Sequence, residues 1–66
     1  MEKMVCKKDY SSSFFNLETP ITHAKEGDLV TLTNQDFTFS YFINEHTQKR
    51  FYIPTIIVNS FFEEVK

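Results

Sequence analysis

Apolar and polar side chains alternate along the second half of this chain. Residues 37–44 read FTFSYFIN, and in an extended strand their side chains point alternately to two faces. The odd-numbered face is wholly apolar and consists of Phe37, Phe39, Tyr41 and Ile43. The even-numbered face is mixed and consists of Thr38, Ser40, Phe42 and Asn44. The pattern predicts a β-strand whose odd-numbered side chains face the core.

The next strand, residues 49–53, presents Phe51 and Ile53 on one face. Both apolar sets lie on the same side of a hairpin only if Ile43 pairs with Phe51 and Tyr41 with Ile53. A slip of one residue would turn one set to water. This register leaves a turn at residues 45–49, typical of a type I turn followed by a bulge. Glycine is preferred at the bulge position, here Gln48, so we expect mild strain there or a loop of another shape.

The remaining segments predict a mainly β chain with one short helical segment. Strands are expected at residues 4–8, 29–34 and 62–65, with a tight turn at residues 34–36. Pro54 cannot donate to a sheet ladder and suits the first turn of a helix. Residues 54–62 (PTIIVNSFF) therefore predict a short helix or 3₁₀ turn before the last strand.

Length and composition point to one domain, residues 1–66, with an aromatic core. A chain of 66 residues is close to the lower limit for a core without disulfides or metal, and the aromatic fraction of 17% compensates for the few core positions. The single cysteine, Cys6, forms no internal disulfide, so we expect a cytoplasmic protein. Apolar runs are too short to span a bilayer, and the formal charge of -2 does not favour nucleic acid.

Two stretches of the chain, and the long connection before the first of them, resemble SH3 domains. Residues 24–32 (AKEGDLVTL) resemble the SH3 stretch in which basic or polar residues, a Gly-Asp turn and an apolar strand follow one another. Residues 51–58 (FYIPTIIV) resemble the SH3 ending, in which a strand runs into a proline, a 3₁₀ turn and a last strand. The long connection between Lys8 and Ala24 contains Asp9-Tyr10, in the place of the ligand-contacting SH3 loop. The resemblance implies a five-stranded SH3-like β-barrel with a long loop after strand 1.

The chain departs from the SH3 pattern at the residues that bind ligands. It has no tryptophan, and Ile57 stands where the family has a tyrosine after the late proline. Because proline-rich peptides dock on stacked aromatics of SH3 domains, we do not expect this chain to bind PxxP ligands. In length and composition the chain is also similar to small proteins encoded by phages and other mobile elements.

Residues able to carry chemistry are few and scattered. His23, His46 and Cys6 lie on separate segments without the paired spacing of a zinc site. No serine or cysteine has a base placed beside it in the sequence. We therefore expect no metal, no cofactor and no enzymatic activity.

The chain has more large rings than one small barrel interior can hold. Either the long loop covers the surplus, or some rings stay exposed as a surface that meets another protein. On the second interpretation a protein partner binds through aromatic anchors with a basic rim: Tyr10, Phe14, Phe15, Phe42 and Tyr52, with Lys7, Lys8 and Lys49. Two alternatives remain open: a barrel that stacks single-stranded nucleic acid on its aromatics, and a monomer or weak homo-oligomer whose strands pair edge to edge.

Overall fold

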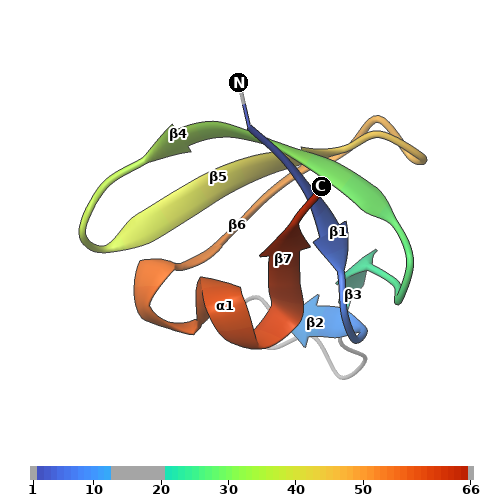
Figure 1. Cartoon of the computed structure of the whole chain (residues 1–66), viewed down its shortest axis with the longest axis horizontal. Helices are drawn as coiled ribbons and strands as arrows, with labels where there is room; N and C mark the ends of the chain where they lie inside the picture. The colour runs from blue at the N-terminus through green and yellow to red at the C-terminus, as the bar shows by residue number, and fades with distance from the viewer. Residues whose placement is uncertain (1, 13–20, 66) are drawn as a thin grey trace.

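The computed structural model describes residues 2–12 and 21–65, and within them the chain is mainly β (Figure 1). The elements in chain order are β1 (Glu2–Cys6), β2 (Tyr10–Ser12), β3 (Ile21–Ala24), β4 (Leu29–Gln35), β5 (Phe39–Asn44), β6 (Arg50–Pro54), the 3₁₀ turn η1 (Thr55–Ile57), α1 (Val58–Phe61) and β7 (Phe62–Glu64). The strands expected from the sequence are found within a few residues of their expected ends. The short helical segment before the last strand is also confirmed.

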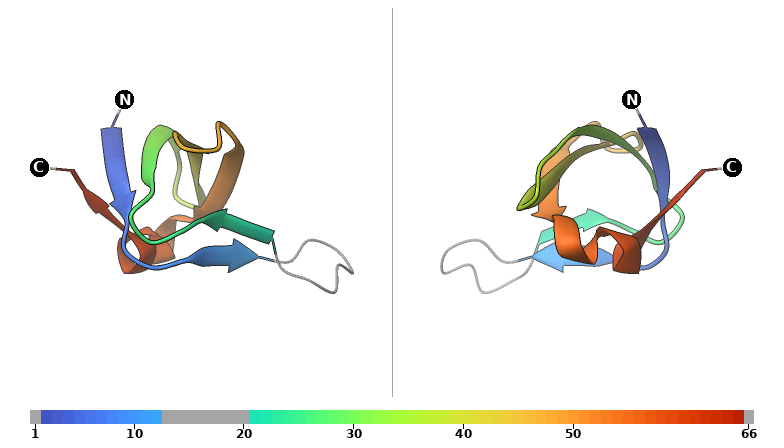
Figure 2. Two further views of the ribbon diagram at one scale, coloured as in Figure 1. Left: turned by 90° about the vertical axis from the view of Figure 1, so that its right-hand side faces the viewer. Right: turned by 60° about the vertical axis from the view of Figure 1, so that its left-hand side comes forward.

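Five strands form one antiparallel sheet in the order β6-β5-β4-β1-β7, and β2 pairs with β3 in a second, two-stranded sheet. The large sheet curves over the core, while α1 and the β2–β3 sheet lie below it (Figure 2). In β4, Leu32 pairs with Phe42 but Asn34 pairs with Tyr41, so Thr33 is the extra residue of a β-bulge. The large sheet has β6 and β7 as its edge strands, so the expected five strands are found, and no closed barrel is shown within the described residues.

Phe42 lies at the centre of the core. Its ring stacks on Phe51 and on Phe62, with centroids 5.5 and 5.0 Å apart. The other buried apolar residues come from all parts of the fold: Met4, Cys6, Tyr10, Ala24, Val30, Ile53 and Val58. Since an aromatic side chain buries on the order of 150–250 Å², this stack supplies a large share of the apolar burial in so short a chain.

The face of β5 that we expected to be buried is the outer one. Phe37 is fully exposed in the turn before the strand and Tyr41 is 37% exposed, whereas Phe42 is 1% exposed. Ser40 and Asn44, on the same face as Phe42, are buried as well. The prediction that the odd-numbered side chains of this strand face the core was therefore wrong.

The reason is a register one residue away from the expected one. Phe42 pairs with Phe51, and Tyr41 pairs with Tyr52. Phe51 and Ile53 do face the core, as predicted, but the turn that precedes them is one residue shorter than we assumed. Hydrogen bonds from the Asn44 and Gln48 N–H groups to the carbonyls of Lys49 and Asn44 close this turn. Gln48 has a φ of 62°, which confirms the strain predicted at that position.

Buried polar side chains make this register favourable, although an alternation of apolar residues does not reveal it. Asn44 is fully hydrogen-bonded: its amide donates to the His23 carbonyl and to Asp28, and its Oδ1 accepts from the N–H groups of His46 and Thr47. A buried polar group costs little free energy only when it is satisfied in this way. The side chain therefore joins the β3 strand, the turn before β4 and the β5–β6 turn.

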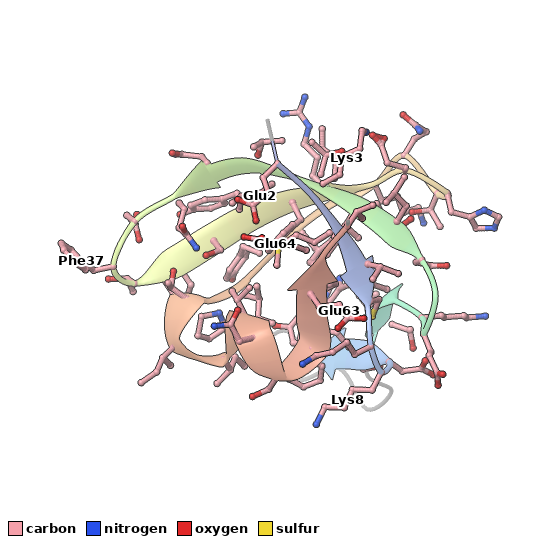
Figure 3. All side chains as sticks on the ribbon, viewed as in Figure 1. Glu2, Lys3, Lys8, Phe37, Glu63 and Glu64 are labelled. Carbon is pink, nitrogen blue, oxygen red and sulfur yellow. The ribbon has the colours of Figure 1, made fainter. Side chains whose placement is uncertain are left out.

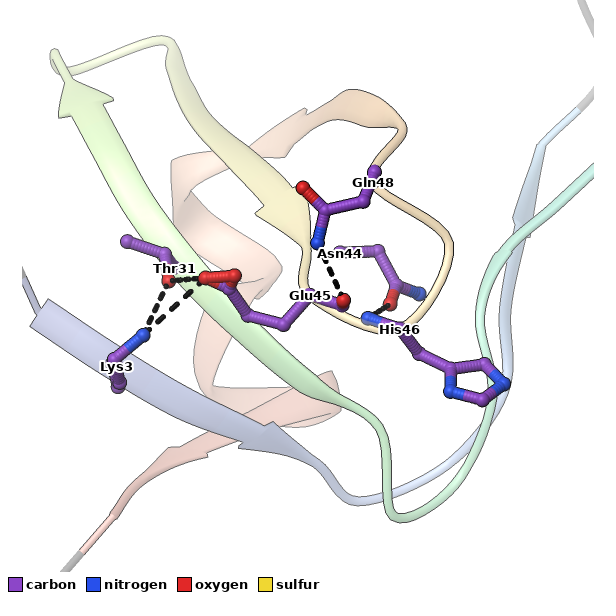
Figure 4. A network of polar contacts seen from close by, with 6 residues as sticks. All are labelled: Lys3, Thr31, Asn44, Glu45, His46 and Gln48. Carbon is purple, nitrogen blue, oxygen red and sulfur yellow. Dashed lines mark hydrogen bonds and ion pairs between the residues drawn. The ribbon is translucent and has the colours of Figure 1, made fainter.

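A second polar network ties the β5–β6 turn to the outside of the sheet. Glu45 accepts a hydrogen bond from the Thr31 hydroxyl at 2.9 Å and forms an ion pair with Lys3 at 3.3 Å (Figure 4). The Gln48 side chain donates to the Glu45 carbonyl in the same turn. These contacts hold the turn against β1 and β4.

Among residues 2–12 and 21–65, no helix has the length and apolar character needed to cross a membrane.

Candidate functional site

The outer face of the β5–β6 hairpin carries three aromatic rings, Phe39, Tyr41 and Tyr52, which we call the aromatic patch. Tyr41 and Tyr52 pair directly across the two strands, with ring centroids 6.1 Å apart. Phe39 meets Tyr52 edge to face at 5.2 Å. The two tyrosines are 37% and 41% exposed. The patch is thus a set of three neighbouring rings, of which the two tyrosines are partly exposed to solvent.

A shallow hollow lies beside the aromatic patch. Its walls include both tyrosines, the Arg50 side chain, and Thr33 and Asn34 from the bulge in β4. The bulge is held in place by a hydrogen bond from the Thr33 hydroxyl to the Tyr41 carbonyl at 3.2 Å. A β-bulge redirects side chains at the edge of a regular ladder. Here it places polar groups next to exposed rings.

The backbone beneath the aromatic patch is anchored from the side of the smaller sheet. The Tyr10 hydroxyl donates to the Tyr52 carbonyl at 3.3 Å, and the Tyr10 ring contacts Phe51 with centroids 6.0 Å apart. On the other side of Tyr10, the Phe61 ring meets it edge to face at 5.1 Å. The edge strand β6 is therefore held by Tyr10 of β2, which packs in turn against Phe61 of α1.

Charge is distributed unevenly around the patch. Arg50 is exposed, and no ion pair of its side chain occurs within the described part of the chain. No carboxylate lines the hollow. Glu2, Glu63 and Glu64 lie instead on β1 and β7 (Figure 3). The face with the tyrosines is locally basic, although the whole chain has a charge of -2.

The structure separates the residues that the sequence had grouped as one surface. Tyr52 is exposed, as a surface anchor must be, but Phe42 and Tyr10 are 1% and 7% exposed and belong to the core. Phe42 was expected on the surface because the faces of β5 were assigned in reverse, and Tyr10 because the resemblance to SH3 domains placed it in the ligand-contacting loop. Phe14 and Phe15 lie outside the described residues.

The three lysines of the expected rim also separate. The Lys7 ammonium donates to the Asn59 carbonyl of α1, and the Lys8 ammonium lies 4.8 Å from the centre of the Phe61 ring. Both lysines thus contact α1 instead of the aromatic patch. Lys49 is exposed at the end of the β5–β6 turn, next to Arg50 in the sequence.

Sequence reasoning missed Phe39, Tyr41 and Arg50. Phe39 and Tyr41 would have been found with Phe42 paired to Phe51, since that register turns the odd-numbered side chains of β5 outward. Arg50 lies on the same face of β6 as Tyr52 in either register. Two signals in the sequence favour the Phe42–Phe51 register: Asn44, which is suited to cap a turn, and Asp36, whose carboxylate accepts from the N–H groups of Thr38 and Phe39 and so delays the start of β5.

One titratable group with a shifted pKa contacts the patch: burial raises the pKa of Tyr10, whose hydroxyl donates to the Tyr52 carbonyl. Burial raises the pKa of the Cys6 thiol, which donates to the Lys8 carbonyl, and burial lowers the pKa of His23. Hydrogen bonds from the Lys25 backbone and the Asn44 amide lower the pKa of Asp28. Among the described residues, no three His, Cys, Asp or Glu side chains are grouped so that they could hold a metal ion.

Comparison of the chain with protein-family models, with curated protein sequences and with solved structures gave no match.

Proposed function

We propose that this chain is a small, non-catalytic protein-interaction module that binds a partner protein through the aromatic patch and the hollow beside it. The observation that carries the proposal is the pair of tyrosines on the outer face of the sheet, 37% and 41% exposed, on a backbone anchored from another element. Tyrosines exposed in this way combine a large apolar ring with a polar end, and they are enriched in protein interfaces.

The tyrosines contribute little to the interior, which is why a binding role is the better account of them. The core rings Phe42, Phe51 and Phe62 lie on the opposite face of the sheet. Replacing Tyr41 or Tyr52 would therefore remove a surface contact and leave the core stack intact. Aromatic side chains held in place before docking lose less conformational entropy when they bind, which lowers the cost of binding.

We further propose that the layout is SH3-like. The strand order, the folding of the β1–β4 connection into β2 and β3, and the 3₁₀ turn between β6 and β7 support this proposal. The proposal concerns the arrangement of strands and not the ligand, because the chain lacks tryptophan and has Ile57 at the position of the late tyrosine. We therefore propose the aromatic patch as a binding surface because of the residues it contains, independently of the SH3-like layout.

Affinity capture with matched variants tests the proposed function. The immobilised chain is exposed to a lysate of its source cells, and captured proteins are quantified by mass spectrometry for the wild type, for the Tyr41→Ala/Tyr52→Ala double variant and for Phe37→Ala. Phe37 is the control because its side chain is fully exposed on the β4–β5 turn (Figure 3) and, unlike the two tyrosines, it does not line the hollow. Circular dichroism establishes that each variant is folded.

The proposal expects one protein to be enriched by the wild type and by Phe37→Ala but lost with the double variant. Central aromatic anchors contribute about 2 kcal/mol or more each when truncated, which corresponds to a weakening of roughly thirtyfold. Equal enrichment by a folded double variant would contradict the proposal.

A further inference from the structure

We infer that the partner segment recognised by the aromatic patch is acidic: an apolar side chain that lies against Tyr41 and Tyr52, with an Asp or Glu placed to meet Arg50. This inference rests on the proposed function and names the chemistry of the partner. It starts from the composition of the hollow, where an arginine and two tyrosines occur together without a carboxylate.

Arg50 is placed to take a carboxylate from outside the chain. Its backbone pairs with Ile43, an apolar residue, so the opposite strand offers its side chain no acidic partner at that position. The nearest acidic residue of the turn, Glu45, is already joined to Lys3 and Thr31. A guanidinium group binds a carboxylate through two parallel hydrogen bonds, a geometry that a lysine does not offer.

The spacing along β6 predicts the spacing in the partner. Arg50 and Tyr52 are two residues apart on one face of a strand, so their side chains leave the backbone roughly 6–7 Å apart. An extended partner segment presents an acidic and an apolar side chain at the same distance when they are two residues apart. A helical segment does so at a spacing of three or four residues.

The hollow also favours protein over nucleic acid as the source of the negative charge. A surface that follows a phosphate backbone needs several cations in a row. Here Arg50 is the one charged residue among those that line the hollow, and the rest of the lining is uncharged: Thr33, Asn34 and the aromatic residues Tyr41, Phe42, Phe51 and Tyr52. One arginine beside two rings suits one carboxylate beside one apolar side chain.

Selection from a random peptide library tests this inference without knowledge of the natural partner. A displayed library of random 12-residue peptides is selected separately on the wild type, on Arg50→Glu, on the Tyr41→Ala/Tyr52→Ala double variant and on Lys25→Glu. The last variant makes the same charge change at an exposed lysine of the β3–β4 turn and serves as the matched control. A bare support provides the background, and a labelled oligo-dT of twelve nucleotides is titrated at two salt concentrations.

The expected peptides from the wild type and from Lys25→Glu carry Asp or Glu at the predicted spacing from an apolar residue. Their affinity falls about tenfold or more on Arg50→Glu, because an ion pair becomes a repulsion. Selection on Arg50→Glu itself should then favour Lys or Arg at that position of the peptide.

The other possible outcomes of the selection and of the oligo-dT titration each refute one part of the proposal. Peptides that depend on both tyrosines but show no acidic preference, or the same preference on Arg50→Glu, refute the acidic partner and leave the proposed function standing. Peptides recovered equally on the double variant refute the proposed function as well. If the wild type recovers no more peptide than the bare support does, an acidic segment is refuted as the ligand. If the wild type binds oligo-dT in a salt-sensitive way and Arg50→Glu abolishes this binding, the ligand is single-stranded nucleic acid instead.

Discussion

Replacing Asn44 with aspartate tests the account of why β5 turns Phe42 and Ser40 inward. The Asn44 amide group is 1% exposed and donates at 3.0 Å both to the His23 carbonyl and to Oδ2 of Asp28. Aspartate has the same shape and keeps the acceptor oxygen that binds the N–H groups of His46 and Thr47. It removes both donated bonds and places a second carboxyl group against Asp28.

The two lost bonds give the scale of the effect. A hydrogen bond between neutral groups contributes ~0.5–1.5 kcal/mol and one to a charged group ~1.5–3 kcal/mol, so the loss is roughly 2–4 kcal/mol before any charge repulsion. A domain of this size has a free energy of unfolding of roughly 3–10 kcal/mol. Asn44→Asp should therefore remove a large part of the stability at neutral pH.

The pH dependence of the loss distinguishes charge repulsion from a simple packing defect. Two carboxyl groups in contact cannot both ionise at low cost, so the folded-state pKa of the introduced carboxyl is raised above its unfolded value of about 3.9. A group with a raised pKa contributes its stability at low pH and loses it as the pH rises through the folded pKa. In the wild type the pKa of Asp28 is lowered, and its contribution is lost as the pH falls. Both effects make the difference between wild type and variant grow with pH.

Urea unfolding followed by far-UV circular dichroism at pH 4.5 and pH 7.5 measures this difference. We expect Asn44→Asp to be destabilised clearly more at pH 7.5 than at pH 4.5. Asn44→Ala, which loses the same donated bonds without adding charge, should show a nearly constant loss. A difference for Asn44→Asp that is equal at the two pH values would refute the contact with Asp28 as the organising feature of the turn.

Three further outcomes are expected. Gln48→Gly should raise the free energy of unfolding by about 0.5–1 kcal/mol, because glycine adopts a φ of 62° without steric cost. The variant loses the hydrogen bond from the Gln48 side chain to the Glu45 carbonyl, but that bond is exposed and contributes little. A melting temperature that does not rise would contradict this expectation. The Cys6 thiol, 2% exposed and with a raised pKa, should react with Ellman's reagent at pH 8 far more slowly in the native protein than in urea, and equal rates would show that it is accessible. Phe42→Ala should cost about 3–5 kcal/mol in urea unfolding, whereas Tyr41→Ala should cost much less; similar losses would contradict the assignment of the two faces of β5.

The position and type of most elements could be predicted from the sequence because they depend on local chemistry. Gly27 lies in the turn between β3 and β4 with a positive φ, and Pro54 is followed by the 3₁₀ turn that its missing donor favours. Gln48 shows the same kind of success, since a turn of this class needs a positive φ near that position whatever residue occupies it.

The candidate site was only partly predictable. Tyr52 lies where the sequence placed it, on the face of β6 opposite Phe51 and Ile53, because both neighbours on that strand are apolar and the alternation is unambiguous. Phe42 was assigned to the wrong face, because the odd-numbered side chains of residues 37–44 are all apolar and apolar content alone favours burying them. The same assignment placed Tyr41 in the core, so its pairing with Tyr52 on the surface was not predicted.

The amino-acid sequence by itself determined that the chain forms short strands with a helical turn before the last one, because alternation and proline or glycine act over a few residues. Only the tertiary structure decided which face of β5 is buried and whether the sheet closes. Those choices depend on contacts far apart in the chain, such as the Asn44 amide with His23 and Asp28 and the Phe42 ring with Phe62. A fully satisfied buried amide and a three-ring stack together outweigh the partial exposure of two tyrosines.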